Sequence, residues 1–314
     1  DYFPIGTTYT YSLWQQSDDV IKPALDREMS LLKIMGVNAI RQYVGIPPRW
    51  VQYIYERHGI YTVLNHSFGR YGVTLDGVYV QNTNYADPRA RKVLIAEVEK
   101  MVDEFRNVPG VLMWLLGNEN NYGLFRGGAE TEDIPVGETK ESVRARHMYA
   151  LFNDAIKAIK ARDTNHPVAM CNGDLLFIDI FGVYMYRGIS FGDAFQQVKE
   201  KLGLPLMFTE FGADAFNARD MREDQIAQAR YVLGNWQEIY EQSSGKGQVG
   251  NSIGGFTFQF SDGWWKFGQE TNLDVHDMNA SWSNGGYLED FKKGENNMNE
   301  EWFGVCAKGP TDQR

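Results

Sequence analysis

The sequence predicts an α/β protein, a single (β/α)₈ (TIM) barrel over residues 1–314. Short apolar runs of strand length alternate along the chain with longer segments whose apolar residues lie three and four apart. This alternation is typical of repeated βα units, and about eight units can be traced. No low-complexity linker or internal repeat divides the chain. Such barrels routinely use ~250 residues or more as a single domain, so one barrel accounts for the whole length.

The individual elements follow from this pattern. The clearest helix begins at Pro88, because Asp87 can cap it, proline suits a first turn, and an apolar stripe continues to Phe105. The other helices are expected at residues 18–35, 47–58, 142–162 and 225–240. The strands are expected at residues 37–43, 60–65, 111–116, 167–171, 180–186, 206–209 and 255–260. The tail from residue 261 is rich in Gly, Asn and Trp and shows no clear final helix.

Composition and charge exclude several classes of protein. A net charge of −10 opposes binding to nucleic acid, which needs clustered Lys and Arg. No apolar stretch reaches the ~18 to 20 residues of a membrane span. Cys171 and Cys306 lie far apart and are expected to be buried thiols. The five histidines show neither His-x-His nor HExxH spacing, so no metal site is expected.

The cellular compartment and the oligomeric state are left open by the sequence. No signal peptide is recognisable at the N-terminus, although Asp1 could follow one that was removed. A secreted or periplasmic location is slightly favoured.

Two glutamates stand where the chemistry of such a barrel is expected, at the carboxyl ends of strands. Glu119 follows the strand at 111–116, and Glu210 follows the strand at 206–209. An unpaired charge at the end of a hydrophobic strand is costly and needs a reason. Hydrolysis of a glycoside with retention needs two carboxyl groups ~5 to 5.5 Å apart, and the ends of different barrel strands can supply them.

The segments around these glutamates resemble known glycosidases. If the strands at 111–116 and 206–209 are counted as barrel strands four and seven, the Asn-Glu pair after the first and the Glu after the second resemble those of the retaining members of clan A glycoside hydrolases. Residues 114–120 and 208–214 are similar to the catalytic barrels of family 2 β-galactosidases and β-glucuronidases, whose auxiliary β-sandwich is not visible in this chain. Residues 181–195 and 209–212 are also similar to fungal-type β-1,3-glucanosyltransferases.

The resemblance implies a role for several residues. Glu210 would form the covalent glycosyl intermediate, and Glu119, protonated at first, would act as acid and then as base. Asn118 matches the asparagine that hydrogen-bonds the sugar 2-hydroxyl. Arg41 matches an arginine that keeps the nucleophile ionised. The tyrosine that contacts the nucleophile is matched by Tyr186, with Tyr184 on the same side of the strand as the alternative.

Further residues are expected to contact a carbohydrate substrate. Trp264 or Trp265 lies after the last strand, where the clan places a tryptophan beneath the sugar. His66 and Asn172 follow two other strands and are expected to bind hydroxyl groups. The loops at residues 69–87 and 123–139 are expected to shape the cleft. The mechanism requires no metal or organic cofactor.

Three alternatives remain beside a hydrolase of β-linked oligo- or polysaccharides. A β-glucan transglycosidase would use the same glutamates and intermediate, with a sugar as acceptor. Residues 188–192 fit the GxSxG motif of serine hydrolases, with Ser190 as nucleophile, His276 as base and Asp214 or Asp262 as acid. A non-catalytic carbohydrate-binding barrel would have lost one of the two glutamates, but both are present.

Overall fold

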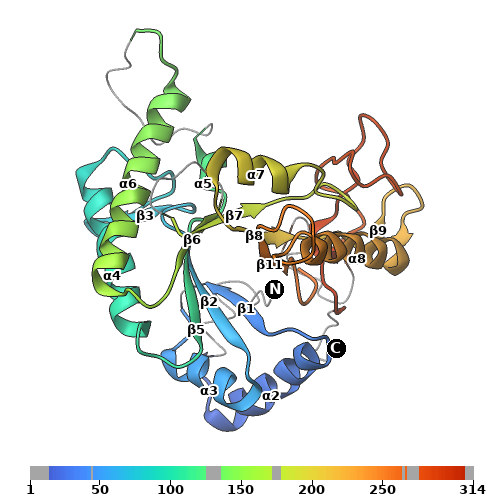
Figure 1. Ribbon diagram of the computed structural model, residues 1–314, viewed down its shortest axis with the longest axis horizontal. Coiled ribbons are helices and arrows are strands. Elements are labelled where there is room, and N and C mark those ends of the chain that lie inside the picture. The colour runs from blue at the N-terminus through green and yellow to red at the C-terminus, as the bar shows by residue number, and fades with distance from the viewer. Residues whose placement is uncertain are drawn as a thin grey trace. The chain divides into compact units, whose positions relative to one another are not determined.

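The computed structural model describes residues 14–43, 45–124, 136–171, 178–263, 266 and 276–307. The chain forms two compact units, the first made of Gln16–Gly182 and the second mainly of Val183–Arg314. Strands and helices alternate along the chain in each of them (Figure 1). No helix among the described residues is both long enough and apolar enough to cross a membrane.

Parallel strands form the sheet of the first unit. They run in the order β1, β2, β5, β6 and β7, and each neighbouring pair is parallel. Their bounds are Ala39–Tyr43, Tyr61–His66, Val111–Leu116, Val168–Cys171 and Ile180–Tyr184. Most of their side chains are buried, as expected of parallel strands that are covered on both faces.

Several helices of the first unit begin or end at residues that satisfy their terminal backbone groups. Asp87 caps α4 by accepting a hydrogen bond of 2.8 Å from the backbone N–H of Arg89. A capping box of Thr139 and Ser142 opens α6, which therefore begins slightly before the predicted start. Gly59 ends α3 in the left-handed conformation, at φ 66°. The bounds are α2 Asp18–Ile34, α3 Pro48–His58, α4 Pro88–Phe105 and α6 Lys140–Arg162.

The segment that was expected to be a loop after β2 contains regular structure. Strands β3 (Val73–Leu75) and β4 (Val78–Val80) pair in an antiparallel hairpin. A single helical turn, α5 (Asn120–Gly123), follows β5. Of the second expected loop, residues 125–135 lie outside the described residues.

The second unit is built around two parallel strands, β8 (Leu206–Phe211) and β11 (Ser252–Thr257). Helix α7 (Ala194–Leu202) precedes β8, and helix α8 (Gln225–Glu241) lies between β8 and β11 in sequence. The remaining elements are the short antiparallel pair β9 (Phe216–Asn217) and β10 (Arg222–Glu223) and the 3₁₀-helix η1 (Glu300–Trp302). In the described part of the tail, η1 is the only helical segment, in line with the missing final helix.

The structure corrects three predicted strand ends in the second half of the chain. Strand β8 continues to Phe211, so Glu210 lies within the strand and not after it. Strand β7 ends at Tyr184, so Tyr186 lies beyond it. Strand β11 ends at Thr257, three residues before the predicted end. The apolar runs do not mark these ends, because the strands are defined by backbone pairing and that pairing does not stop where the apolar side chains do.

Candidate active site

Arg41 organises the polar residues at the strand ends of the first unit. It is buried, with 2% of its surface exposed. Its Nε donates to Oδ1 of Asn65 over 2.8 Å, and its Nη2 donates to Oδ1 of Asn118 over 3.0 Å. Asn65 in turn donates to the carbonyl of Gly117 over 2.8 Å. The guanidinium of Arg41 on β1 therefore connects Asn65 on β2 with Asn118 after β5, and Asn65 also binds the backbone there.

Asn120 fixes the turn in which Asn118 and Glu119 stand. Its Oδ1 accepts from the backbone N–H of Asn118 over 2.7 Å. Its amide nitrogen donates to the carbonyl of Phe68 over 2.9 Å and to the hydroxyl of Tyr85 over 2.8 Å. This buried side chain thus holds the loop after β5 against the loop after β2.

Glu119 has an unusual backbone in this turn. Its φ of 57° and ψ of 36° place it in the left-handed region, which costs a non-glycine residue about 1 kcal/mol or more. The residue is half-buried. Glycine would adopt this conformation without strain. A glutamate that is kept here is therefore typical of a residue whose side chain is needed for function.

Glu210 is held by a tyrosine in the second unit. Its side chain lies on β8 and is 9% exposed. The hydroxyl of Tyr186 donates to its Oε1 over 2.6 Å, and the N–H of Met185 donates to its backbone carbonyl over 2.9 Å. Tyr186, one of the two candidate tyrosines, is therefore bonded to the carboxylate.

Tyr186 is itself fixed by the described part of the tail. Its carbonyl accepts from Nδ2 of Asn284 over 2.9 Å. Its ring makes edge contacts with Trp282 and Phe303, at centroid separations of 6.0 and 5.7 Å. Phe258, just beyond β11, packs in the same apolar cluster. No motif in the sequence singled out this phenylalanine, because the family resemblance implies a tryptophan after this strand.

The other predicted contact residues are placed differently. His66 ends β2, where its Nδ1 accepts from the N–H of Phe68 over 3.1 Å and its Nε2 lies 3.6 Å from a carboxylate oxygen of Glu97. Burial lowers the pKa of His66 to about 4, so its ring is neutral near pH 7. Asn172, Trp264 and Trp265 lie outside the described residues.

The described residues contain no group of three or more His, Cys, Asp or Glu side chains that could hold a metal ion.

Sequence reasoning also missed Asn65, Asn120 and Tyr71, whose hydroxyl accepts from Nδ2 of Asn118 over 2.5 Å. For Asn65, the only signal in the sequence was that a polar residue stands at the end of β2. This signal was met equally by its neighbour His66, which was selected instead.

The residues of the GxSxG motif have other partners. The hydroxyl of Ser190 donates to a carboxylate oxygen of Glu238, and the second oxygen of Glu238 accepts from the N–H of Phe191 over 2.7 Å. His276 bonds to Asp262 over 2.9 Å. This hydrogen bond raises the pKa of His276. The serine thus helps to fix the turn before α7 to helix α8.

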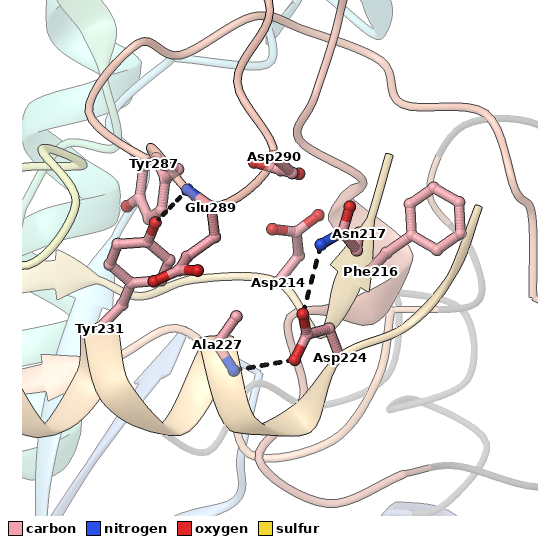
Figure 2. Close-up of a pocket in the computed structure, with 9 residues that line it drawn as sticks. All are labelled: Asp214, Phe216, Asn217, Asp224, Ala227, Tyr231, Tyr287, Glu289 and Asp290. Atoms are coloured by element: carbon pink, nitrogen blue, oxygen red, sulfur yellow. Dashed lines mark hydrogen bonds between the residues drawn. The ribbon is translucent and has the colours of Figure 1, made fainter. Parts of the chain in front are cut away.

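Asp214, the other acid considered for a serine triad, lines a small acidic pocket in the second unit (Figure 2). Its Oδ2 accepts from the N–H of Asn299 over 2.8 Å. Burial raises the pKa of Asp214 well above its usual range, and the nearby Asp290 adds to this effect. The bond from Asn299 to Asp214 ties the segment after β8 to the tail.

The described residues thus include βα units, a tyrosine-bound glutamate on one strand and an Asn-Glu pair after another. The sequence matches the family described as "Glycosyl hydrolases family 2, TIM barrel domain" over residues 19–243. The chain belongs to this family. The match confirms both the predicted (β/α)₈ barrel and the resemblance to family 2; that all 314 residues form one domain stays a prediction.

Solved structures with the same fold include three enzymes named for uronic acids. One is the Bacteroides uniformis β-glucuronidase 2, bound covalently to cyclophellitol-6-carboxylate aziridine (TM-score 0.59, 15% identity, 91% of this chain and 31% of that chain). Another is the Bifidobacterium dentium β-glucuronidase with coumarin-3-O-glucuronide (TM-score 0.54, 18% identity, 93% and 41%). The third is the Eisenbergiella tayi β-galacturonidase with galacturonate (TM-score 0.54, 16% identity, 91% and 44%).

The chain therefore spans less than half the length of these three enzymes. At such low identity the likeness concerns the fold alone. Comparison with curated proteins finds no match.

Proposed function

We propose that this barrel is the catalytic domain of a retaining β-glycosidase that cleaves β-linked oligo- or polysaccharides, with Glu210 as nucleophile and Glu119 as acid/base. The observation that carries the proposal is the bond from Tyr186 to Glu210, 2.6 Å long, on a nearly buried strand. A neutral donor on a carboxylate orients one oxygen and leaves the other for attack. The part of the proposed site around Glu119 is supported by Arg41, which donates a hydrogen bond to Asn118, the residue before Glu119.

In the proposed first step, an oxygen of Glu210 attacks the anomeric carbon while Glu119 gives its proton to the departing glycosidic oxygen. The bond between the anomeric carbon and this oxygen breaks, the aglycone leaves as an alcohol, and the sugar becomes an ester of Glu210. In the second step, Glu119 takes a proton from water as the water oxygen attacks the same carbon. Glu210 then leaves as a carboxylate, with the β configuration restored.

A sugar hydroxyl in place of water would make the enzyme a transglycosidase through the same intermediate, and this remains the second candidate function. The related structures named as β-glucuronidases and a β-galacturonidase give reason to test uronides beside neutral sugars. The net charge of −10 disfavours an anionic substrate only weakly, because local charges dominate inside a site.

The test is a screen of the full chain with 4-nitrophenyl β-glucoside, β-galactoside, β-glucuronide and β-galacturonide and with β-1,3-, β-1,4- and β-1,6-glucans. Products longer than the substrate would identify a transglycosidase. With the best substrate, Glu210→Ala and Glu119→Ala are each expected to lose about 10³-fold or more in kcat.

Azide separates the two roles. It should rescue Glu210→Ala by attack on the face opposite the aglycone, giving an α-glycosyl azide. It should rescue Glu119→Ala after the covalent intermediate has formed, giving a β-glycosyl azide. Ser190→Ala is the matched control and should keep activity within about twofold. Wild-type activity in either glutamate variant, or a first product of inverted configuration, would contradict the proposal.

A further inference from the structure

We propose that Arg70 binds an anionic group of the substrate, a carboxylate or a sulfate ester, and so gives the site a preference for acidic sugars. The inference rests on the proposed function, because that function places a carbohydrate beside Asn118 and Glu119. It concerns an arginine in the loop after β2 that no motif in the sequence pointed to.

The guanidinium of Arg70 has no group that compensates its charge. Within the part of the chain that the structure describes, it has neither a hydrogen bond nor a carboxylate at ion-pair distance, and its Nε is buried. It lies over the ring of Tyr71, 5.5 Å from the ring centre. An arginine is always charged and carries five N–H donors, so a half-buried guanidinium without a partner is costly. An anion supplied by a ligand would remove this cost.

The loop that carries Arg70 is fixed on both sides of this residue. The carbonyl of Gly69 accepts from Oγ1 of Thr83 over 2.6 Å and from the N–H of Gly72 over 3.2 Å. Gly72 has a φ of +124°, and a Cβ there would lie 2.6 Å from the carbonyl oxygen of Val80. Only glycine allows this close approach of the two segments. The backbone around Arg70 is therefore held in place before a ligand arrives, which lowers the entropy lost on binding.

Arg70 lies beside the turn that carries the proposed acid/base. The hydroxyl of Tyr71, the next residue, accepts from Nδ2 of Asn118 over 2.5 Å. The hydroxyl of Tyr85 accepts from the amide of Asn120 over 2.8 Å. Burial raises the pKa of Tyr85 to about 12, while the bond from Asn120 and the positive charge of Arg70 act against this rise. The cation is thus close to the partners of both neighbours of the proposed acid/base.

The chemistry of a guanidinium selects an anion over a neutral sugar. Its planar fork of N–H groups matches two oxygens of a carboxylate or a sulfate ester, and such charge-assisted bonds are about twice as strong as neutral ones. A sugar hydroxyl could accept one of these hydrogen bonds, but it would leave the positive charge uncompensated. The substrate expected here therefore carries an anionic group on the side that faces the loop after β2.

The experiment compares substrates that differ in the anionic group. The pairs are 4-nitrophenyl β-glucoside and β-glucuronide, β-1,4-glucan oligosaccharides before and after oxidation of their 6-hydroxyls to carboxylates, and β-galactan oligosaccharides without and with sulfate esters. The wild type should prefer the acidic member of at least one pair. A preference confined to the uronates assigns a carboxylate as the ligand, and one confined to the sulfated sugars assigns a sulfate ester.

Arg70→Met should lower kcat/KM for the preferred acidic member about tenfold or more, mainly through KM, and leave its neutral counterpart within about twofold. Arg70→Lys keeps the charge without the fork and should recover part of the loss. Where the wild type cleaves only the acidic member, the loss in Arg70→Met should shrink as NaCl is raised, because salt screens the attraction that the variant lacks.

Arg49→Met is the matched control. The guanidinium of Arg49 also lies over the ring of the next residue, Trp50, 4.6 Å from its centre, but it is paired with Asp18 at 3.1 Å. This variant should leave the ratio between acidic and neutral substrates unchanged.

Four results would overturn the inference while the proposed function stands. They are an active wild type that prefers no acidic member, equal losses on both members of a pair in Arg70→Met, no loss on either, and, where only the acidic member is cleaved, a loss that does not change with salt. A wild-type chain inactive on every substrate tested overturns the proposed function instead, and the inference with it.

Discussion

Replacing Tyr186 by Phe removes one hydroxyl from the second unit and keeps the ring. That hydroxyl donates to Oε1 of Glu210 over 2.6 Å, and a hydrogen bond to a charged group contributes about 1.5–3 kcal/mol. Since about 1.4 kcal/mol corresponds to tenfold in rate, loss of an orienting bond of this size predicts a fall in kcat/KM of about 10- to 150-fold. The edge contacts with Trp282 and Phe303 remain, so the free energy of unfolding should fall by no more than the contribution of the lost bond, about 1.5–3 kcal/mol.

The assay is steady-state kinetics on the best aryl β-glycoside, with urea unfolding of the same preparations. Tyr184→Phe is the matched control, because Tyr184 is a tyrosine two residues earlier on the same segment. The reasoning is refuted if Tyr186→Phe keeps wild-type kcat/KM within twofold while Glu210→Ala is inactive. It is refuted equally if Tyr184→Phe loses as much activity as Tyr186→Phe.

Three further predictions concern stability. Burial acts to raise the pKa of Asp163, but hydrogen bonds from a backbone N–H, a histidine and Trp114 lower it. The difference in unfolding free energy between the wild type and Asp163→Asn, measured in urea, should therefore be full above about pH 5 and shrink towards pH 3. A difference that stays constant with pH would contradict this prediction. Because the pKa of buried His66 is lowered to about 4, its side chain should cost the wild type roughly 3 kcal/mol as pH falls from about 6.5 to 4; His66→Gln should remove that part of the pH dependence, and an unchanged slope would contradict this. Phe208 stacks on Phe191 at 3.8 Å between ring centres, so Phe208→Ala should lose about 3–5 kcal/mol in urea unfolding, and a loss below about 1 kcal/mol would show that the site collapses around the gap.

Much of the fold could be predicted because its signals are local. The start of α4 depends on Asp87 and on the residues that follow it directly, and the observed cap is the expected one. The run at 111–116 is apolar because parallel strands are covered on both faces, and β5 has these bounds. Both glutamates were singled out for the same reason, as charges at the ends of apolar runs. A periodic pattern of a few residues is enough to determine such features.

The partners of the site residues could not be predicted in the same way. Arg41 and Asn118 lie 77 residues apart in sequence, and Tyr186 and Glu210 lie 24 apart. Nothing in the sequence near Tyr71 indicates that its hydroxyl meets Asn118. Such contacts depend on which strands become neighbours and on the register in which they pair.

The sequence by itself therefore determined the βα repeat, the helix ends and the two glutamates, because each depends on residues that are close along the chain. Only the tertiary structure decided that Tyr186 binds Glu210, that Arg41 orients Asn118, and that Asn118 meets Tyr71. The physical reason is that hydrogen bonds between side chains are short and directional. Their partners are selected by packing in three dimensions, which a one-dimensional pattern does not record.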